Sequence, residues 1–251
     1  IVATINKLLP NHPVAESLHR LLAALFVQNK EYSRAFSEYQ TLERIANPVD
    51  KANAGNEIFN FAEEARRAEA CDYAAQAYRL ILNLEKSPYT FPALMGMGQC
   101  LRVQGKYPEA LEAFAQLLQK TGNNNRNPWT LRAWREQAEI YFNDLADMAN
   151  AIEIYKRIYD AYSDNAVREK SDVVFRLGDC YLAKGDLKNA GQWYVTAQRF
   201  AAKSALIQDK INFSLARLEY FQGRFRPALQ LLETVTSRPR AREEEENGEE
   251  T

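Results

Sequence analysis

Small and apolar residues recur along the chain at helical intervals, in pairs of short segments separated by a turn. The pattern is clearest in residues 94–114, 174–194 and 215–232. In each, a turn glycine lies seven positions after a first small residue and five positions before a second small residue. Both segments carry apolar residues at the spacing of one helix face. The pattern therefore predicts pairs of amphipathic helices joined by tight turns.

The small residues have a structural explanation. Glycine occupies all three turns, at Gly105, Gly185 and Gly223. Because glycine accepts a left-handed backbone, it can end the first helix and reverse the chain. Gly178 and Ala190 are expected to lie where the paired helices approach most closely. Aromatic residues such as Tyr181 and Tyr194 would fill the space between successive pairs.

This arrangement resembles the tetratricopeptide repeat, in which an aromatic residue, Leu-Gly and Tyr precede a turn glycine, and Tyr, Ala, an aromatic residue and Ala follow it. The 171–200 unit matches most fully, with Leu177, Gly178, Tyr181, Gly185, Ala190, Tyr194 and Ala197. The alanines of the second helices stand at 35, 74, 110, 151, 190 and 228, and are 36 to 41 residues apart. The resemblance implies an all-α superhelix, a solenoid of about six antiparallel helix pairs.

Three copies depart from the pattern at the turn. Lys30 stands where glycine is expected in the first copy, and the second turn contains no glycine. The fourth copy, around Trp134 and Tyr155, has one extra turn residue and no glycine. The spacing exceeds the usual repeat of about 34 residues, and such long connections resemble bacterial members of the family.

The resemblance covers residues 14–238, and the flanking segments differ from it. Residues 1–13 read as the end of a preceding repeat helix, and 239–251 form an acidic segment with nothing apolar to bury, which predicts a flexible tail. Because the chain begins at Ile1, we expect a fragment or a processed chain. The sequence does not determine the cellular compartment of the protein, and it favours the cytoplasm over a bacterial periplasm.

Charge and composition narrow the function. The 32 Lys and Arg residues balance 33 Asp and Glu residues, so no net charge attracts nucleic acid. No apolar run approaches the roughly 18 residues of a membrane span, which predicts no membrane insertion. The 46% hydrophobic and 26% charged residues are typical of a folded chain.

Residues for catalysis or metal binding are sparse. The two histidines, His12 and His19, have no metal-ligand spacing, and the three cysteines are scattered and read as buried apolar residues. Gly98 to Lys106 lacks the spacing and the Ser or Thr of a phosphate-binding loop. We therefore predict no enzymatic activity, no catalytic residues, no metal and no cofactor.

The resemblance implies a partner-binding surface. In tetratricopeptide arrays the first helix of each pair lines the concave face, with positions two, five, nine and twelve of each unit pointing inward. The candidate partner-binding residues in this frame are Phe59, Met95, Gln99, Arg102, Arg135, Glu139, Phe175, Asp179, Phe213 and Arg217. The large apolar residues at the fifth position indicate either an exposed peptide-binding groove or packing against neighbouring repeats.

Three functions remain open on the sequence alone. The first is a non-enzymatic scaffold that binds a protein or peptide along the concave face. The second is self-assembly, because a solenoid with an unpaired end offers a surface to an identical copy. The third is an accessory region of a larger protein.

Overall fold

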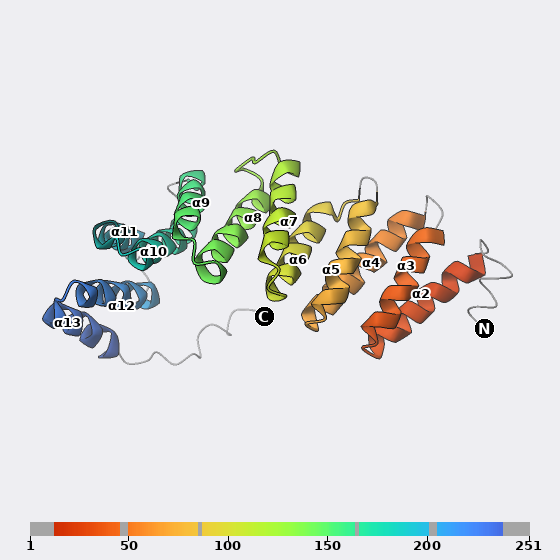
Figure 1. Ribbon diagram of the computed structural model, residues 1–251, viewed down its shortest axis with the longest axis horizontal. Helices are drawn as coiled ribbons and strands as arrows, with labels where there is room; N and C mark the ends of the chain where they lie inside the picture. The colour runs from red at the N-terminus through yellow and green to blue at the C-terminus, as the bar shows by residue number, and fades with distance from the viewer. Residues whose placement is uncertain (1–12, 46–49, 85–86, 164–165, 201–204, 238–251) are drawn as a thin grey trace, which may run out of the picture. The chain divides into compact units, whose positions relative to one another are not determined.

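The computed structural model describes residues 13–45, 50–84, 87–163, 166–200 and 205–237. Within these ranges the regular structure is helical, with no β-strand. The predicted all-α repeat architecture is confirmed (Figure 1). The expectations for residues 1–12 and 239–251 fall outside the described residues, and Pro13 begins the first described helix.

Twelve α-helices form six consecutive pairs in the described part of the chain, and we call the first helix of each pair helix A and the second helix B. The A helices are α2 (Pro13–Gln28), α4 (Asp50–Arg67), α6 (Thr90–Val103), α8 (Pro128–Glu139), α10 (Val167–Ala183) and α12 (Ala205–Phe221). The B helices are α3 (Tyr32–Ile45), α5 (Cys71–Asn83), α7 (Tyr107–Lys120), α9 (Met148–Ala161), α11 (Leu187–Phe200) and α13 (Phe225–Thr236).

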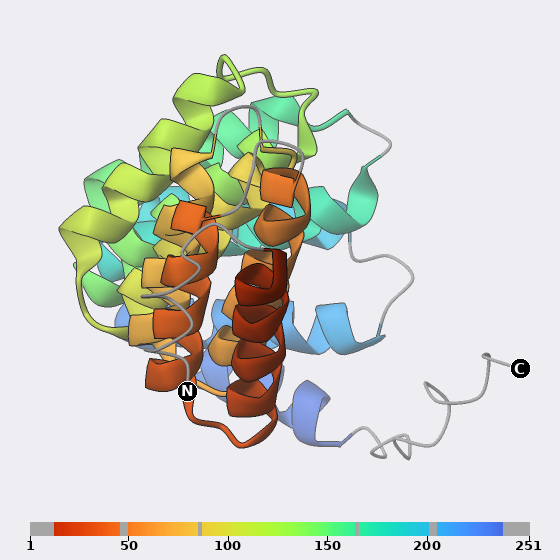
Figure 2. The same ribbon diagram turned by 90° about the vertical axis from the view of Figure 1, so that its right-hand side faces the viewer.

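The chain divides into two compact units, residues 1–140 and 141–251. In unit 1 the helices α2 to α8 pack in chain order, so that each contacts the next. Both Figure 1 and Figure 2 show α2 beside α3 at one end of this unit. In unit 2 the helices α9 to α13 pack in the same sequential way. The boundary falls within the fourth pair, since α8 belongs to unit 1 and α9 to unit 2.

In two of the pairs, α6 with α7 and α10 with α11, a glycine of helix A faces an aromatic ring of helix B. A Cβ atom added to Gly178 would lie 2.3 Å from Cε1 of Tyr194, and one added to Gly98 would lie 2.6 Å from the ring of Phe114. Both aromatic side chains are fully buried. The predicted close approach at Gly178 is therefore real, and the aromatic ring is what requires the glycine.

All six turns share one backbone conformation. A residue with positive φ follows each helix A at Lys30, Glu69, Gly105, Ala146, Gly185 and Gly223. In five of the turns the next backbone N–H bonds to a carbonyl five residues earlier, as Glu31 does to Phe26 at 2.8 Å and Lys106 to Leu101 at 2.9 Å. This hydrogen bond is the usual end of a helix that reverses through a left-handed residue. The turn is thus the same whether or not glycine occupies it.

Replacing Glu69 with glycine should raise the free energy of unfolding by about 0.5–1 kcal/mol, because a side chain in the left-handed region strains the backbone. Gly105 occupies the equivalent position, and a Cβ atom added there would meet no neighbouring atom. Gly105→Ala should therefore lower stability by a similar amount through backbone strain alone. Urea denaturation of both variants measures the two changes. Equal stability of Glu69→Gly and the parent chain would contradict this account.

The extra residue of the fourth copy lies inside a helix. Ala138 and Ala146 are eight residues apart, where the equivalent residues of other pairs are seven apart. The intervening Ile140–Asp144 segment, η1, is a π-helix, whose wider turn takes up one more residue. The closing hydrogen bond, from Asp147 N–H to Tyr141 at 2.7 Å, accordingly spans six residues instead of five.

Candidate functional site

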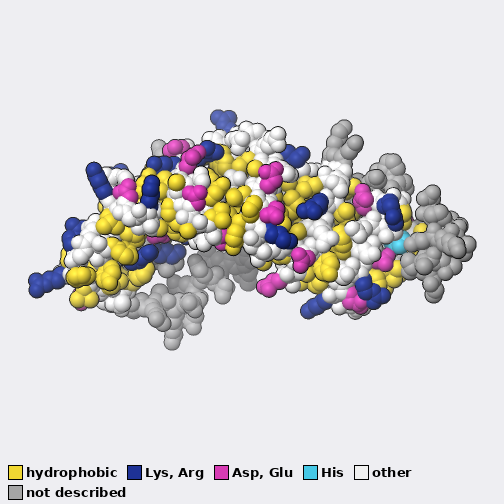
Figure 3. Space-filling view, in the orientation of Figure 1, with side chains coloured by type: hydrophobic (Ala, Val, Ile, Leu, Met, Phe, Trp, Pro, Cys, Tyr) yellow, Lys and Arg dark blue, Asp and Glu magenta, His cyan; other side chains and the backbone are white. Residues whose placement is uncertain are grey.

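Unit 1 contains a groove of about 740 Å³ that crosses the A helices of four successive pairs, α2, α4, α6 and α8. Both signs of charge and hydrophobic side chains are interspersed on the face of unit 1 in Figure 3. Helix α3 contributes Tyr39 to the lining. Because every A helix follows its predecessor in the same orientation, equivalent positions of successive pairs come to lie along one groove.

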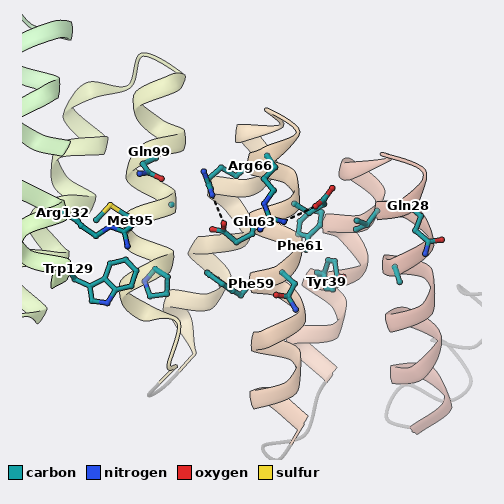
Figure 4. A pocket seen from close by; sticks show the side chains of 17 residues that line it. Gln28, Tyr39, Phe59, Phe61, Glu63, Arg66, Met95, Gln99, Trp129 and Arg132 are labelled. Atoms are coloured by element: carbon teal, nitrogen blue, oxygen red, sulfur yellow. Dashed lines mark hydrogen bonds and ion pairs between the residues drawn. The ribbon is translucent and has the colours of Figure 1, made fainter. Parts of the chain in front are cut away.

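The apolar part of the groove comes from three of these helices. Phe59 of α4, Met95 of α6 and Trp129 of α8 line it in succession (Figure 4). The Met95 side chain is only 3% exposed, whereas Phe59 and Trp129 are half-buried. Phe59 is held by stacking on Tyr89, with ring centroids 4.7 Å apart. The groove therefore has a rigid apolar floor with accessible aromatic sides.

The charged part of the groove centres on α4. Glu63 accepts a hydrogen bond from Arg66 at 2.8 Å and another from the hydroxyl of the buried Tyr78. Burial opposes ionisation of Glu63, but the hydrogen bonds from Arg66 and Tyr78 outweigh it, so the pKa of this carboxyl lies below its ordinary value. Burial, followed by the bond to Glu63, raises the pKa of the Tyr78 phenol. Glu63 thus stays ionised and fixes Arg66 beside the groove.

A second arginine lies over the aromatic side of the groove. The guanidinium carbon of Arg132 is 4.8 Å from the centroid of the Trp129 ring, a cation–π contact. Within the described ranges Arg132 has no carboxylate partner. Arg67, by comparison, lies 3.6 Å from Glu64. Arg132 therefore presents a positive charge next to an indole, both exposed to an incoming ligand.

The sequence-predicted site residues divide between the units. Phe59, Met95 and Gln99 line the groove, and Gln99 donates a hydrogen bond of 2.7 Å to Glu136. Arg102 lies on the same helix, 3.6 Å from Glu136. The predicted residues outside the lining are Arg102, Arg135 and Glu139 in unit 1, and Phe175, Asp179, Phe213 and Arg217 in unit 2.

The four predicted residues of unit 2 have different environments. Asp179 accepts a hydrogen bond of 2.7 Å from the hydroxyl of Tyr194 and lies 3.6 Å from Arg217. Phe175 packs against Tyr194, with ring centroids 6.2 Å apart, and against a buried cluster that includes Val174. Asp179 and Phe175 therefore contribute to packing between helices, whatever else they bind.

An exposed apolar row at the fifth positions is not what the structure contains. Met95 is buried and Phe59 and Phe175 are half-buried, whereas Phe213 is 50% exposed. The first three side chains pack against neighbouring residues, and two of them, Phe59 and Met95, also line the groove. Their burial differs because each pair places different side chains next to the same position.

Several lining residues were missed in the sequence. Arg132 and Pro92 occupy the second position of their units, one of the four inward positions, so the repeat frame could have identified them. Trp129 and Tyr39 lie outside that frame. Trp129 precedes the first inward position of α8, and Tyr39 belongs to a B helix, so no periodic signal pointed to either.

The remaining candidate residues for chemistry are structural. Among the described residues no group of three or more His, Cys, Asp or Glu side chains is arranged to hold a metal ion. His19 is buried and hydrogen-bonded to Glu38, while His12 lies outside the described residues. Cys71, Cys100 and Cys180 are buried free thiols. None of the described helices has both the length and the apolarity needed to cross a membrane.

The middle of the chain matches a known family in sequence. A sequence model described as tetratricopeptide repeat matches residues 89–164, from the loop before α6 to beyond the end of α9. The turns, the small residues facing aromatic rings and the sequential helix pairs agree with it. Residues 89–164 therefore carry tetratricopeptide repeat sequence, and the described helices on either side share the same repeat architecture. Such repeats are generally non-catalytic scaffolds for protein–protein interaction, and the fold of the chain supports that general function.

Solved structures share this repeat architecture at low sequence identity. The BtubC (BKLC) protein of P. vanneervenii matches with a TM-score of 0.62 and 15% identity, over 84% of this chain and 90% of that one. A Podosopora anserina protein with nearly identical TPR-like repeats has a TM-score of 0.62 and 16% identity, over 74% and 95%. MamA has a TM-score of 0.56 and 16% identity, over 73% and 90%. No curated protein matches the chain in sequence.

Proposed function

We propose that this tetratricopeptide repeat chain is a scaffold that binds an extended segment of a partner protein along the groove of unit 1. The observation that carries the proposal is the succession of Phe59, Met95 and Trp129 from three separate helices along one open groove. An extended peptide matches such a surface because its side chains can contact successive helices. Half-buried aromatic side chains that are held in place lose little conformational entropy on binding.

The lining also favours one chemistry for the partner. Phe59 and Trp129 would flank an apolar side chain that rests on Met95. Arg132, which has no carboxylate partner among the described residues, would bind an acidic residue next to that apolar one. Bidentate binding of a carboxylate is the common role of an exposed arginine at an interface. The preferred segment is therefore an apolar residue adjacent to Asp or Glu.

Selection from a random peptide display library on the full chain tests the proposal. Selected peptides should share an apolar residue next to an acidic one. Isothermal titration should give a Kd at least about tenfold weaker for Trp129→Ala and for Arg132→Glu, since loss of one anchor costs more than about 1.4 kcal/mol. Both side chains are accessible, so helical content by circular dichroism should stay unchanged.

Phe213→Ala is the matched control, because Phe213 is an exposed aromatic residue of an A helix outside the groove. It should leave the Kd of the selected peptides unchanged. Peptides that bind Trp129→Ala and Arg132→Glu as tightly as the parent chain would place the binding surface elsewhere. An equal loss in Phe213→Ala would extend it into unit 2.

A further inference from the structure

The Gln99 side chain lies in the groove with its amide held at one end. The amide nitrogen donates a hydrogen bond of 2.7 Å to Oε1 of Glu136 on α8. Because an ionised carboxylate accepts hydrogen bonds but cannot donate them, the nitrogen has to face Glu136. The amide oxygen, on the other side of the group, therefore points away from Glu136. Glu136 thus determines which way round the amide lies.

Glu136 is itself held in place. Its other carboxylate oxygen lies 3.6 Å from Nη1 of Arg102, and the side chains of Arg102 and Glu136 are only 25% and 23% exposed. Gln99 and Arg102 are three residues apart on α6, on one side of the helix. The carboxylate of Glu136 therefore has a partner at each oxygen, and both partners come from α6. This arrangement leaves the amide of Gln99 little freedom to turn over.

The amide oxygen of Gln99 is available to a ligand. Gln99 lines the groove, one helical turn from Met95 on the same face of α6 (Figure 4). Within the described part of the chain nothing donates a hydrogen bond to this oxygen. An apolar side chain that rests on Met95 would bring its backbone beside Gln99. The groove therefore presents a hydrogen-bond acceptor next to its apolar floor.

The equivalent residues of the two preceding A helices do not offer such an acceptor. Ala24 of α2 has no polar side-chain atom. Both carboxylate oxygens of Glu63 on α4 already accept hydrogen bonds, from Arg66 and from Tyr78. Of the described helices α2, α4 and α6, only α6 therefore has a free acceptor at this position, on Gln99.

We propose that Gln99 accepts a hydrogen bond from one backbone N–H of the bound segment, and that Glu136 is the positioning residue that keeps the amide in the accepting orientation. This contact rests on the proposed function, because the segment is the one bound along the groove of unit 1. A buried N–H without an acceptor is unfavourable, so a segment on the apolar floor needs such a bond. Proline lacks an N–H and is therefore excluded at that position of the segment.

A scan of backbone N-methylation tests the hydrogen bond. The probe is a peptide selected from the display library on the full chain and resynthesised with each backbone N–H replaced in turn by an N-methyl group. We define the methylation penalty as the Kd of a methylated peptide divided by that of the unmodified peptide. At one position it should be about three- to tenfold larger for the parent chain than for Gln99→Met, since methionine has no amide oxygen. The selected peptides should lack proline at the same position.

Two substitutions of Glu136 test its positioning role. Lysine donates hydrogen bonds and cannot accept them, so Glu136→Lys should turn the amide over and abolish the penalty that depends on Gln99. Glutamine can accept or donate, so Glu136→Gln should populate both orientations of the amide and reduce this penalty about twofold. The penalty is a ratio of two Kd values for one variant, so a general change in charge attraction cancels. A residue that only stabilised α8 would leave the ratio unchanged.

Glu112→Lys is the matched control. Glu112 accepts a hydrogen bond of 3.1 Å from Gln116, but both residues lie on α7 outside the groove. The methylation penalty should keep its parent value in this variant. All four variants should retain the parent helical content by circular dichroism.

Three results would contradict the proposal, and they are distinguishable. If Trp129→Ala weakens binding but no methylation penalty depends on Gln99, the groove binds the segment without this hydrogen bond. If the penalty is the same in Glu136→Lys, Glu136→Gln and the parent chain, Glu136 does not position the amide. Peptides that bind Trp129→Ala as tightly as the parent chain would overturn the proposed function and the Gln99 contact together.

Discussion

Replacing Phe114 with alanine should lower the free energy of unfolding by about 3–5 kcal/mol, the range for large aromatic residues in protein cores. Phe114 is fully buried, and its ring lies against Gly98. Because Gly98 has no side chain that could move into the vacated space, the cavity cannot collapse easily. Poor collapse places the expected loss toward the upper end of the range.

Urea denaturation followed by circular dichroism measures this loss, and Phe213→Ala is the comparison. Phe213 is also a phenylalanine of the repeat but is 50% exposed, so its replacement should change stability by less than about 0.5 kcal/mol. Similar losses for the two variants would show that the ring of Phe114 is not a central part of the core.

Gly178→Ala should lower the free energy of unfolding by about 2 kcal/mol, within the range of about 1–3 kcal/mol that overpacking typically costs. Helix propensity alone would favour alanine by about 0.8–1.0 kcal/mol, so the sign of the change is informative. The added methyl group would lie 2.3 Å from the ring of Tyr194, which must then move. Movement of that ring also disturbs the hydrogen bond of its hydroxyl to Asp179.

A double-mutant cycle with Tyr194→Leu separates overpacking from other effects. In the Tyr194→Leu background the clash is relieved, so Gly178→Ala should be neutral or stabilising there. Urea denaturation of the parent chain, both single variants and the double variant gives the coupling energy. If Gly178→Ala stabilises the chain that retains Tyr194, the ring is not what excludes a side chain at this position.

The helix pairs could be predicted from sequence because their determinants are local. The distance between a small residue and the turn, and between the turn and the alanine of helix B, is fixed by the contact of two adjacent helices. Gly98, Gly105 and Ala110 are therefore enough to place a pair. Glu69 shows why composition is a weaker guide than spacing, since the left-handed turn forms there without glycine. Packing of the two helices imposes the conformation that glycine only favours.

The candidate site was less predictable because exposure depends on neighbouring pairs. Met95 and Phe213 occupy the same position of their units, yet one is buried and the other half exposed. The neighbours that decide this come from residues about 40 positions away, and no periodic pattern identifies them. Trp129 was missed for a related reason. Its place in the groove follows from the way α8 packs after α6, which is a property of the assembled unit.

The π-helix η1 has a consequence for how this repeat is aligned with others. It stores an inserted residue within the helix, so the residues before Ile140 and those after Asp144 keep the roles of their counterparts. A fixed-length template that places the gap in the turn would assign Tyr141 and Phe142 to the wrong sides of the helix. An alignment that matches residues of the same structural role must place its one-residue gap between Ala138 and Ala146. Repeats of different length are best compared at this segment.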